Sequence, residues 1–212
     1  GWGWDMTASG ERKGVSEDDQ TGNWLSVAGG DLTEILAEAK DMTGQKLALM
    51  GMDACLMGTW EVANVVAPYA DVYVGSQATE SVDGWAYHTA YADLVADPEM
   101  DAAELGTVFA WRFIETRDAT QSVVDLTALE GLNAAIDDLA LAVLDAEVPR
   151  DAIIDAASSA QTFDGDMPDR DLGDLSLLLL EESGSADIAD AAGVAWDELQ
   201  GAVIANYTHG SW

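Results

Sequence analysis

The sequence predicts an α/β fold organised around a parallel sheet, and two observations lead to it. The first is a strand–helix–strand unit: an apolar run at 47–52, a helix-like segment at 57–66 and a second apolar run at 71–74. Strands joined by a helix in this way lie parallel in one sheet. The second is the size of the chain, because 212 residues with 49% hydrophobic content suit one large α/β domain.

The residues before this unit predict a loop and a helix. Residues 1–30 are rich in Gly, Ser, Thr and charged residues without a regular period, which predicts a long loop with a short strand at 24–27. Asp31 is a favourable N-cap and Glu34 stands three positions later, as in a capping box, so we expect a helix to begin at Asp31. Gly44 is suited to close that helix.

Further helices and strands are predicted after the unit. Residues 85–95 have a helical or irregular pattern. We expect Thr127 to cap a long helix that Pro149 ends. The other predictions are a helix from Asp101, a strand at 121–126, a helix at 151–162, an acidic loop at 162–171, a helix at 172–180, and a last helix at 186–206 that runs into a strand at 203–205.

The charge of the chain is strongly negative, since 40 Asp and Glu stand against 8 Lys and Arg for a net charge of −32. Such a surface repels phosphates and anionic lipid, so nucleic acid is not an expected partner. Regular apolar periodicity separates the chain from disordered acidic sequences. We interpret the charge as that of a halophilic protein. Salt at about 1 M shortens the Debye length to about 3 Å and so screens the repulsion between the acidic side chains. The sequence contains no run of 18 apolar residues, so we predict no membrane-spanning helix in it.

Cys55, the only cysteine, directly follows the first apolar run, and a polar loop at 77–84 follows the second. Open parallel sheets carry their chemistry beyond the carboxyl ends of the strands, so we expect both features at one edge of the sheet. A single cysteine forms no internal disulfide. It is a small core residue, a reactive thiol or an intermolecular link, and the thiol's surroundings decide between these.

Residues 53–87 read DACLMGTWEVANVVAPYADVYVGSQATESVDGWAY and resemble the core motif of the clostripain-like cysteine peptidases. In that family an Asp-x-Cys-x-Met run precedes a Glu-rich helix, an ADY-V-S strand and a GW-Y motif. The segments SVVDL at 122–126 and DLGDL at 171–175 extend the resemblance. It implies a caspase-like three-layer α/β/α sandwich with a mostly parallel central sheet. Residues 1–212 would be a single peptidase domain that lacks its N-terminal strands and its C-terminal end.

The resemblance implies that Cys55 is the nucleophile of a cysteine endopeptidase. Such an enzyme needs a thiolate, an imidazole base and oxyanion donors. Cys55 stands where the strand meets the helix, so the helix N-terminus would favour the thiolate. The family's histidine precedes the cysteine in a motif like His-Gly-Ser-Gly-Trp. Gly1-Trp2 resembles the end of that motif, so we expect the base upstream of Gly1. His209 is a second, less favoured candidate for the base. His88 is expected to pack or form hydrogen bonds.

The resemblance also implies cleavage after Arg or Lys. Carboxylates bind Arg as a bidentate fork and Lys as a point charge. Asp53 and Asp83 stand at the motif positions of the family's pocket acids, Glu80 adds a third carboxylate, and Ser76 is expected to line the pocket floor. The alternative is that these acids are three solvated charges among 40.

Arg12 and Lys13 form the one basic cluster of the first loop. Relatives are cut in the loop after the catalytic histidine, which implies self-cleavage after Arg12 or Lys13. The alternative is a solvated loop tip.

Two other functions remain open from the sequence. One is a catalytically inactive relative that serves as a binding or surface protein, and the other is an unrelated α/β domain with Cys55 in its core. No His or Cys spacing predicts a metal site, and no cofactor is required; Ca²⁺ is an alternative because Asp164-Gly165-Asp166 offers carboxylates and some relatives respond to calcium. We expect a secreted or cell-surface monomer whose partner is a peptide or protein substrate.

Overall fold

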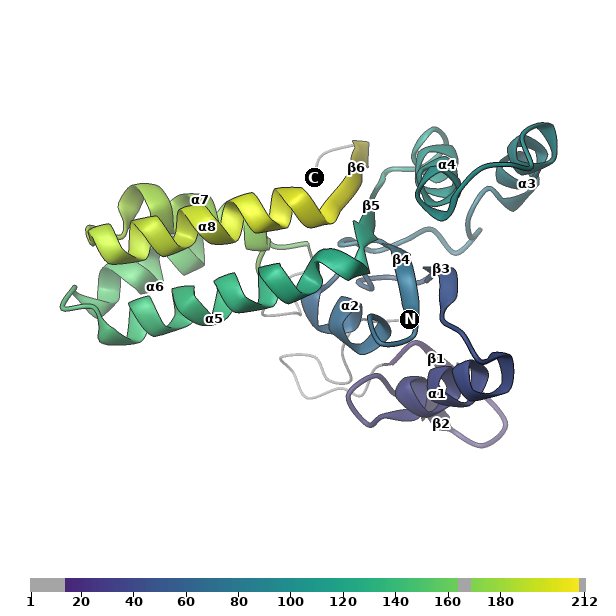
Figure 1. Cartoon of the computed structure of the whole chain (residues 1–212), viewed down its shortest axis with the longest axis horizontal. Coiled ribbons are helices and arrows are strands. Elements are labelled where there is room, and N and C mark those ends of the chain that lie inside the picture. The colour runs from purple at the N-terminus through teal and green to yellow at the C-terminus, as the bar shows by residue number, and fades with distance from the viewer. Residues whose placement is uncertain (1–13, 164–168, 210–212) are drawn as a thin grey trace. The chain divides into compact units, whose positions relative to one another are not determined.

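The computed structural model describes residues 14–163 and 169–209 (Figure 1). Contacts divide the chain into two compact units. The sheet unit comprises residues 1–127 and 203–212, and the helical unit comprises residues 128–202. The single peptidase domain predicted over residues 1–212 stays a prediction.

The sheet unit contains the predicted strand–helix–strand unit and half of the predicted helices. Its elements are β1 (Ser16–Asp18), β2 (Asn23–Leu25), α1 (Asp31–Thr43), β3 (Leu47–Gly51), α2 (Trp60–Val66), β4 (Ala70–Gly75), α3 (Tyr87–Ala96), α4 (Ala102–Ile114), β5 (Ala119–Asp125) and β6 (Val203–His209). β1 and β2 form a separate antiparallel hairpin. The main sheet has the strand order β3-β4-β5-β6.

The main sheet is mixed, so the prediction of a mostly parallel sheet is not confirmed in the described residues. β3 and β4 are parallel, with Leu49 opposite Val72, as the strand–helix–strand pattern requires. β4 pairs antiparallel with β5, and β5 pairs antiparallel with β6. The reason lies in the connection: α3 and α4 lead the chain back to the edge where β4 ends, and β5 therefore runs in the opposite direction. The sequence pattern contains no signal for this return.

Both faces of β4 are covered by apolar packing. Val72 and Val74 face the cluster that includes Phe109 and Phe113 of α4. Tyr73, which points to the other face, is 1% exposed, and its hydroxyl donates to the Met57 carbonyl at 2.9 Å. Alternate side chains of a strand point to opposite faces, so this strand is buried from both sides, as the helical cover of an α/β sheet requires.

Helix ends test the capping predictions. Asp101 and Glu104 form a complete capping box at α4, and Gly44 closes α1 with φ 72°. The capping box predicted at Asp31 is wrong, because Gly30 is the N-cap and the Asp31 carboxylate accepts from the Ser26 N–H instead.

Two boundaries after β5 also differ from the predictions. Thr127 does not cap the long helix: a 3-10 turn, Leu126–Ala128, precedes it, and the Asp125 carboxylate accepts from Thr127. β6 begins at Val203 as predicted and runs on to His209, beyond the predicted 203–205. His209 therefore ends a strand.

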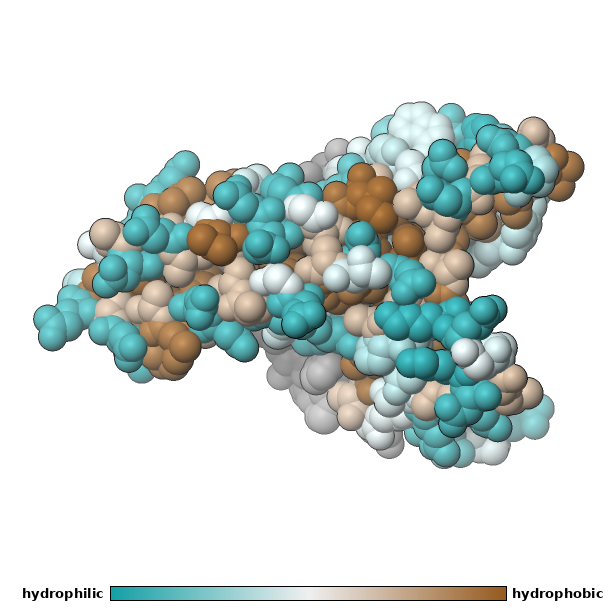
Figure 2. Space-filling model, viewed as in Figure 1, coloured by the Kyte–Doolittle hydropathy of each residue, from teal (hydrophilic) through white to brown (hydrophobic). Residues whose placement is uncertain are grey.

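The helical unit consists of α5 (Leu129–Asp145), α6 (Arg150–Ser159), α7 (Leu172–Glu182) and α8 (Ala186–Ala202). α8 packs against α5 and α7 around a buried cluster that includes Leu139, Leu179 and Ile188. In the ranges 14–163 and 169–209, none of the helices has the length and apolar character to cross a membrane. Hydrophilic residues predominate on the face seen in Figure 2, with hydrophobic patches between them.

Candidate active site

Cys55 lies in the segment between β3 and α2, beyond the carboxyl end of β3, as predicted. It is partly buried. The next residue, Leu56, has φ 57°, the left-handed region that a non-glycine residue adopts at a cost, and its N–H donates to the Ala78 carbonyl at 3.0 Å. The segment is thus turned sharply at the thiol and fastened to the residues that follow β4.

Glycine permits this close approach. A Cβ at Gly58 would lie 2.8 Å from the main chain of Ser76 and Gln77, nearer than Cβ atoms come. The Gly58 N–H donates to the Ser76 carbonyl at 2.6 Å. The two segments that follow β3 and β4 therefore meet at one sheet edge, as the parallel pair predicts.

The Cys55 sulfur contacts the main chain of Glu80. The Glu80 N–H donates to the sulfur at 3.2 Å, and the thiol donates to the Glu80 carbonyl at 3.8 Å. The helix predicted to begin at Met57 starts instead at Trp60, behind the N-cap Thr59, so its N-terminus is not at the cysteine. The thiol is positioned by the 77–84 loop rather than by a helix N-terminus.

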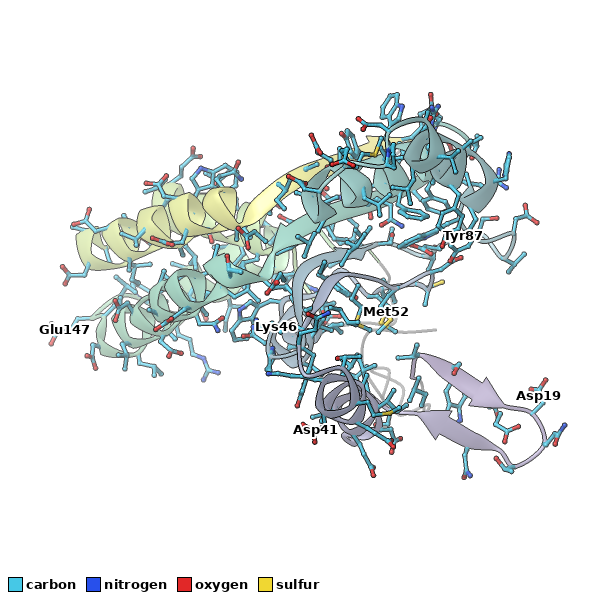
Figure 3. All side chains as sticks on the ribbon, turned by 45° about the vertical axis from the view of Figure 1, so that its right-hand side comes forward. Asp19, Asp41, Lys46, Met52, Tyr87 and Glu147 are labelled. Carbon is cyan, nitrogen blue, oxygen red and sulfur yellow. The ribbon has the colours of Figure 1, made fainter. Side chains whose placement is uncertain are left out.

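Asp53 is exposed, and one oxygen of its carboxylate accepts two hydrogen bonds. The donors are the Trp85 main-chain N–H and the Tyr87 hydroxyl, both at 3.0 Å. Gly84 has φ 71°, and a Cβ there would lie 2.9 Å from the Asp53 carboxylate, so the turn requires glycine. Burial raises the pKa of Tyr87 to about 12, and the hydrogen bond and charge of Asp53 add to this, so the hydroxyl remains a donor at neutral pH. Figure 3 labels Tyr87 at the start of α3 and Met52 just beyond β3.

The Glu80 side chain is partly buried and fully engaged. The Trp85 indole N–H donates to both carboxylate oxygens at 3.2 and 3.1 Å, and the Gln121 amide donates to one of them. Burial raises the pKa of Glu80 to about 8; the charge of Asp53 adds to the rise, and the two donors oppose it. Trp85 is 8% exposed and packs on Phe109 and Phe113 of α4. Glu80 thus ties the loop to the core.

The other two predicted pocket residues have different surroundings. Asp83 is exposed and pairs with the Arg117 guanidinium at 3.3 Å, a contact with no sequence signal. Ser76 is completely buried, and its hydroxyl lies 3.1 Å from that of Thr120. Direct contact of Ser76 with a substrate is therefore not supported, and its place is beneath the loop.

Neither histidine of the described residues contacts Cys55. His209, exposed at the end of β6, lies 2.9 Å from the Asp118 carboxylate and opposite Ala119 of β5. β6 is three strands from β3, about 14 Å at the usual strand spacing, so His209 is not placed as the base. His88 is exposed on α3, which contradicts a packing role, and the alternative of a hydrogen-bonding role stays a prediction. Arg12, Lys13 and Asp164-Gly165-Asp166 lie outside the described residues.

Sequence reasoning missed two partners in the site. Gln121 is completely buried in β5, and a lone amide within an apolar strand was the available signal. Arg117 precedes that strand and had no signal. Within residues 14–163 and 169–209, no group of three His, Cys, Asp or Glu side chains is placed to hold a metal ion.

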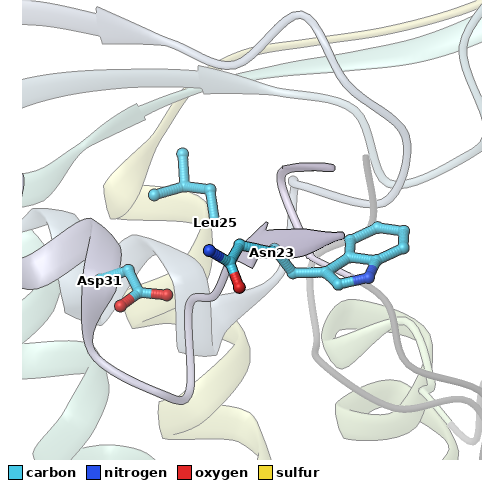
Figure 4. A pocket seen from close by; sticks show the side chains of 4 residues that line it. Asn23, Leu25 and Asp31 are labelled. Carbon is cyan, nitrogen blue, oxygen red and sulfur yellow. The ribbon is translucent and has the colours of Figure 1, made fainter. Parts of the chain in front are cut away.

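A hollow of about 420 Å³ lies elsewhere, lined by Asn23, Trp24, Leu25 and Asp31 (Figure 4). None of these side chains is a nucleophile, and Cys55 is not among them. The Cys55 thiol, together with the carboxylates of Asp53 and Glu80, therefore remains the better candidate for a catalytic site.

Comparison with known families decides what this arrangement is. The model of the clostripain family matches residues 1–176. The chain belongs to the clostripain family. Cys55, Asp53 and the Gly84-Trp85 turn all lie within the matched residues. A comparison with curated protein sequences found no match.

Solved structures of clostripain-family proteases share the fold. A clostripain from Bacteroides thetaiotaomicron ATCC 29148, in complex with the peptide inhibitor BTN-VLTK-AOMK, has a TM-score of 0.65 and 18% identity over 93% of this chain and 79% of its own. A secreted C11 cysteine protease from the same species, in complex with an irreversible peptide inhibitor, has a TM-score of 0.67 and 20% identity over 92% of this chain and 52% of its own.

A third similar structure is an inactive zymogen C11 protease from Parabacteroides distasonis. Its TM-score is 0.61, with 20% identity over 84% of this chain and 47% of its own. The chain thus spans about half the length of two of these proteins. At such identities the likeness confirms the α/β fold of the clostripain-family proteases.

Proposed function

We propose that the chain is part of a cysteine endopeptidase that cleaves after Arg or Lys, with Cys55 as the nucleophile. The observation that carries the proposal is the position of the partly buried thiol, two residues after the exposed carboxylate of Asp53, in a chain of the clostripain family. An oriented carboxylate beside a nucleophile suits the binding of a cationic P1 side chain.

The reaction follows from the thiol. A histidine base takes the thiol proton, and the sulfur attacks the carbonyl carbon of the scissile bond. The same imidazole returns the proton to the leaving amine, and water then hydrolyses the acyl-enzyme. Tetrahedral intermediates of this kind require N–H donors at the oxyanion.

We propose that the histidine base stands at the end of a further strand, which pairs with the free edge of β3. β3 is the outer strand of the described sheet, and among the described residues no strand pairs with its other edge. Leu47 of β3 is 38% exposed. A parallel strand added at this edge would end beside Cys55, which is where a histidine in a motif ending Gly1-Trp2 would lie.

Basic specificity rests on Asp53 first. Tyr87 and the Trp85 main chain orient its carboxylate, whereas Asp83 is already paired with Arg117. The VLTK peptide of the inhibitor bound to the Bacteroides clostripain ends in lysine, which favours the same class of substrate here.

Processing and export are parts of the same proposal. One structural neighbour is an inactive zymogen and another is a secreted protease. The zymogen favours self-cleavage, which we place after Arg12 or Lys13. The secreted protease favours a location outside the cell. The three-layer α/β/α sandwich would be completed by the strands added beside β3.

The proposal is tested with the full-length protein in molar salt. Fluorogenic peptide amides that differ only at P1 (Arg, Lys, norleucine and Asp) are compared in the wild type and in Asp53→Asn. We expect hydrolysis of the Arg and Lys peptides alone, and a rise in KM of at least tenfold in Asp53→Asn. Equal hydrolysis of the norleucine peptide would remove the basic specificity, and no hydrolysis by the folded protein would favour a catalytically inactive relative.

A further inference from the structure

Glu80 joins the thiol to the Asp53 carboxylate. Its main-chain N–H and carbonyl both contact the Cys55 sulfur, as described above. Its side chain is held by Trp85, whose main-chain N–H also donates to Asp53. Glu80 and Asp53 are therefore held by the same residue, Trp85, and the main chain of Glu80 holds the thiol.

The charges that face Glu80 are of one sign in the described residues. Burial is the main cause of the raised pKa of Glu80, and the charge of Asp53, in the segment after β3, adds to it. Tyr73 of β4 and Tyr87 of α3 also respond to the charge of Glu80. Cys55 contacts its main chain, and Gln121 of β5 and Trp85 are neutral donors. No lysine, arginine or histidine of the described residues pairs with Glu80.

Gln121, beside Glu80, has a buried amide oxygen without a hydrogen-bond partner. The side chain as a whole is completely buried. An amide offers a donor and an acceptor on one rotatable group. Gln121 can thus donate to Glu80 as a carboxylate, or turn its oxygen to accept from Glu80 as a carboxylic acid. The site accommodates both protonation states of Glu80.

We propose that Glu80 is a positioning residue that couples the binding of a basic P1 side chain at Asp53 to the release of a proton from part of the molecules. In the empty site Glu80 is a carboxylic acid that donates to the Gln121 amide oxygen, and the negative charge of Asp53 favours this form. A cation bound at Asp53 neutralises the charge that adds to the proton affinity of Glu80, whereas burial continues to favour the proton. A fraction of the proton then passes to solvent, and the carboxylate that forms is held by Trp85 and Gln121. This inference rests on the proposed specificity for Arg or Lys.

The test is calorimetric binding of N-acetyl-arginine amide to the full-length protein in molar salt. The Cys55→Ala background removes the titration of the thiol. Titrations in two buffers of different ionisation enthalpy, at pH values from 6 to 10, measure the protons released on binding. Glu80→Gln keeps the size of the side chain and removes its titration, and Glu61→Gln makes the same change at an exposed position on α2.

We expect the background protein and its Glu61→Gln variant to release a fraction of a proton near pH 8, with affinity falling by less than tenfold per pH unit as the pH decreases. In Glu80→Gln this release and this slope disappear. If Glu80→Gln does not fold, Trp85→Phe serves instead: loss of the indole donor moves the release profile to higher pH.

Binding without proton release, or release that Glu80→Gln leaves unchanged, overturns the coupling but leaves the basic specificity intact. A profile that Trp85→Phe does not move overturns it equally. Absence of binding at every pH overturns both the specificity and the coupling. A merely structural role for Glu80 would lower the stability of the variant without changing the number of protons released by the folded protein.

Discussion

The main-chain nitrogen of Glu80 lies 3.2 Å from the sulfur of Cys55 and donates a hydrogen bond to it. The side chain of the same residue receives the Trp85 indole N–H, and the Trp85 main chain donates to Asp53. The candidate nucleophile and the candidate specificity residue are therefore positioned by one loop, residues 77–84, and the turn that follows it. This arrangement leads to the predictions below.

Tyr87 orients Asp53, so Tyr87→Phe is expected to weaken the binding of basic substrates. A hydrogen bond to a charged group contributes about 1.5–3 kcal/mol, which corresponds to a rise in KM of about tenfold or more for an Arg peptide. The ring stack with Tyr91 remains. Steady-state kinetics with the Arg peptide measure the change, and Tyr91→Phe is the matched control. A similar KM in both variants would contradict the role of the hydroxyl.

Arg117 pairs with Asp83, and Arg117→Gln is expected to free a second carboxylate for the substrate. The side chains are 33% and 70% exposed, and such ion pairs contribute about 0–1 kcal/mol. KM for the Arg peptide should therefore fall by up to about fivefold. Arg150→Gln, an exposed change on α6, is the control. An unchanged or higher KM in Arg117→Gln would show that Asp83 takes no part in binding.

Glu80 makes the stability of the fold depend on pH. Its pKa is raised from its usual value near 4.5 to about 8, mainly by burial. The folded state then binds a proton that the unfolded state loses, so the free energy of unfolding falls as the pH rises from about 4.5 to about 8. The slope is at most about 1.4 kcal/mol per pH unit, and less because the side chain is only partly buried.

Glu80→Gln should flatten this dependence. Urea unfolding at pH 5 and pH 9 in molar salt measures it, with Glu61→Gln expected to follow the wild type. Parallel behaviour of Glu80→Gln and the wild type would mean that Glu80 titrates alike in the folded and unfolded chains.

The net charge of −32 predicts a strong dependence on salt. Self-repulsion destabilises the compact state, and 1 M salt shortens the Debye length to about 3 Å. The midpoint of thermal unfolding should rise by several degrees between 0.1 and 2 M NaCl. A neutral osmolyte at equal osmolality separates screening from preferential exclusion, and a salt-independent midpoint would count against a halophilic protein.

Local patterns of the sequence predict much of the sheet unit. The parallel pair of β3 and β4, the start of a helix at Asp101 and the closing role of Gly44 each depend on neighbouring residues. The same holds for Cys55 and the 77–84 loop, because the carboxyl ends of parallel strands share an edge.

What the sequence could not predict depends on contacts between distant residues. The antiparallel directions of β5 and β6 follow from how the chain returns to the sheet. Asp31 bonds to Ser26 rather than capping its own helix, because a glycine in the left-handed conformation precedes it. The pairing of Asp83 with Arg117 and of Glu80 with Gln121 joins the loop to β5 and the turn before it, and neither pairing has a local pattern.

Covalent labelling of Cys55 shows whether this thiol is the nucleophile of a peptidase that recognises a basic side chain. A biotinylated peptidyl chloromethyl ketone that ends in lysine is incubated with the folded full-length protein in molar salt. Its chloride leaves as the Cys55 sulfur bonds to the methylene carbon, and the adduct is mapped by mass spectrometry. We predict one adduct, on Cys55, that is absent in Cys55→Ala, suppressed by N-acetyl-arginine amide and not formed by the same peptide ending in aspartate. Labelling of Cys55 by both peptides alike, or no labelling of the folded protein, would contradict the account.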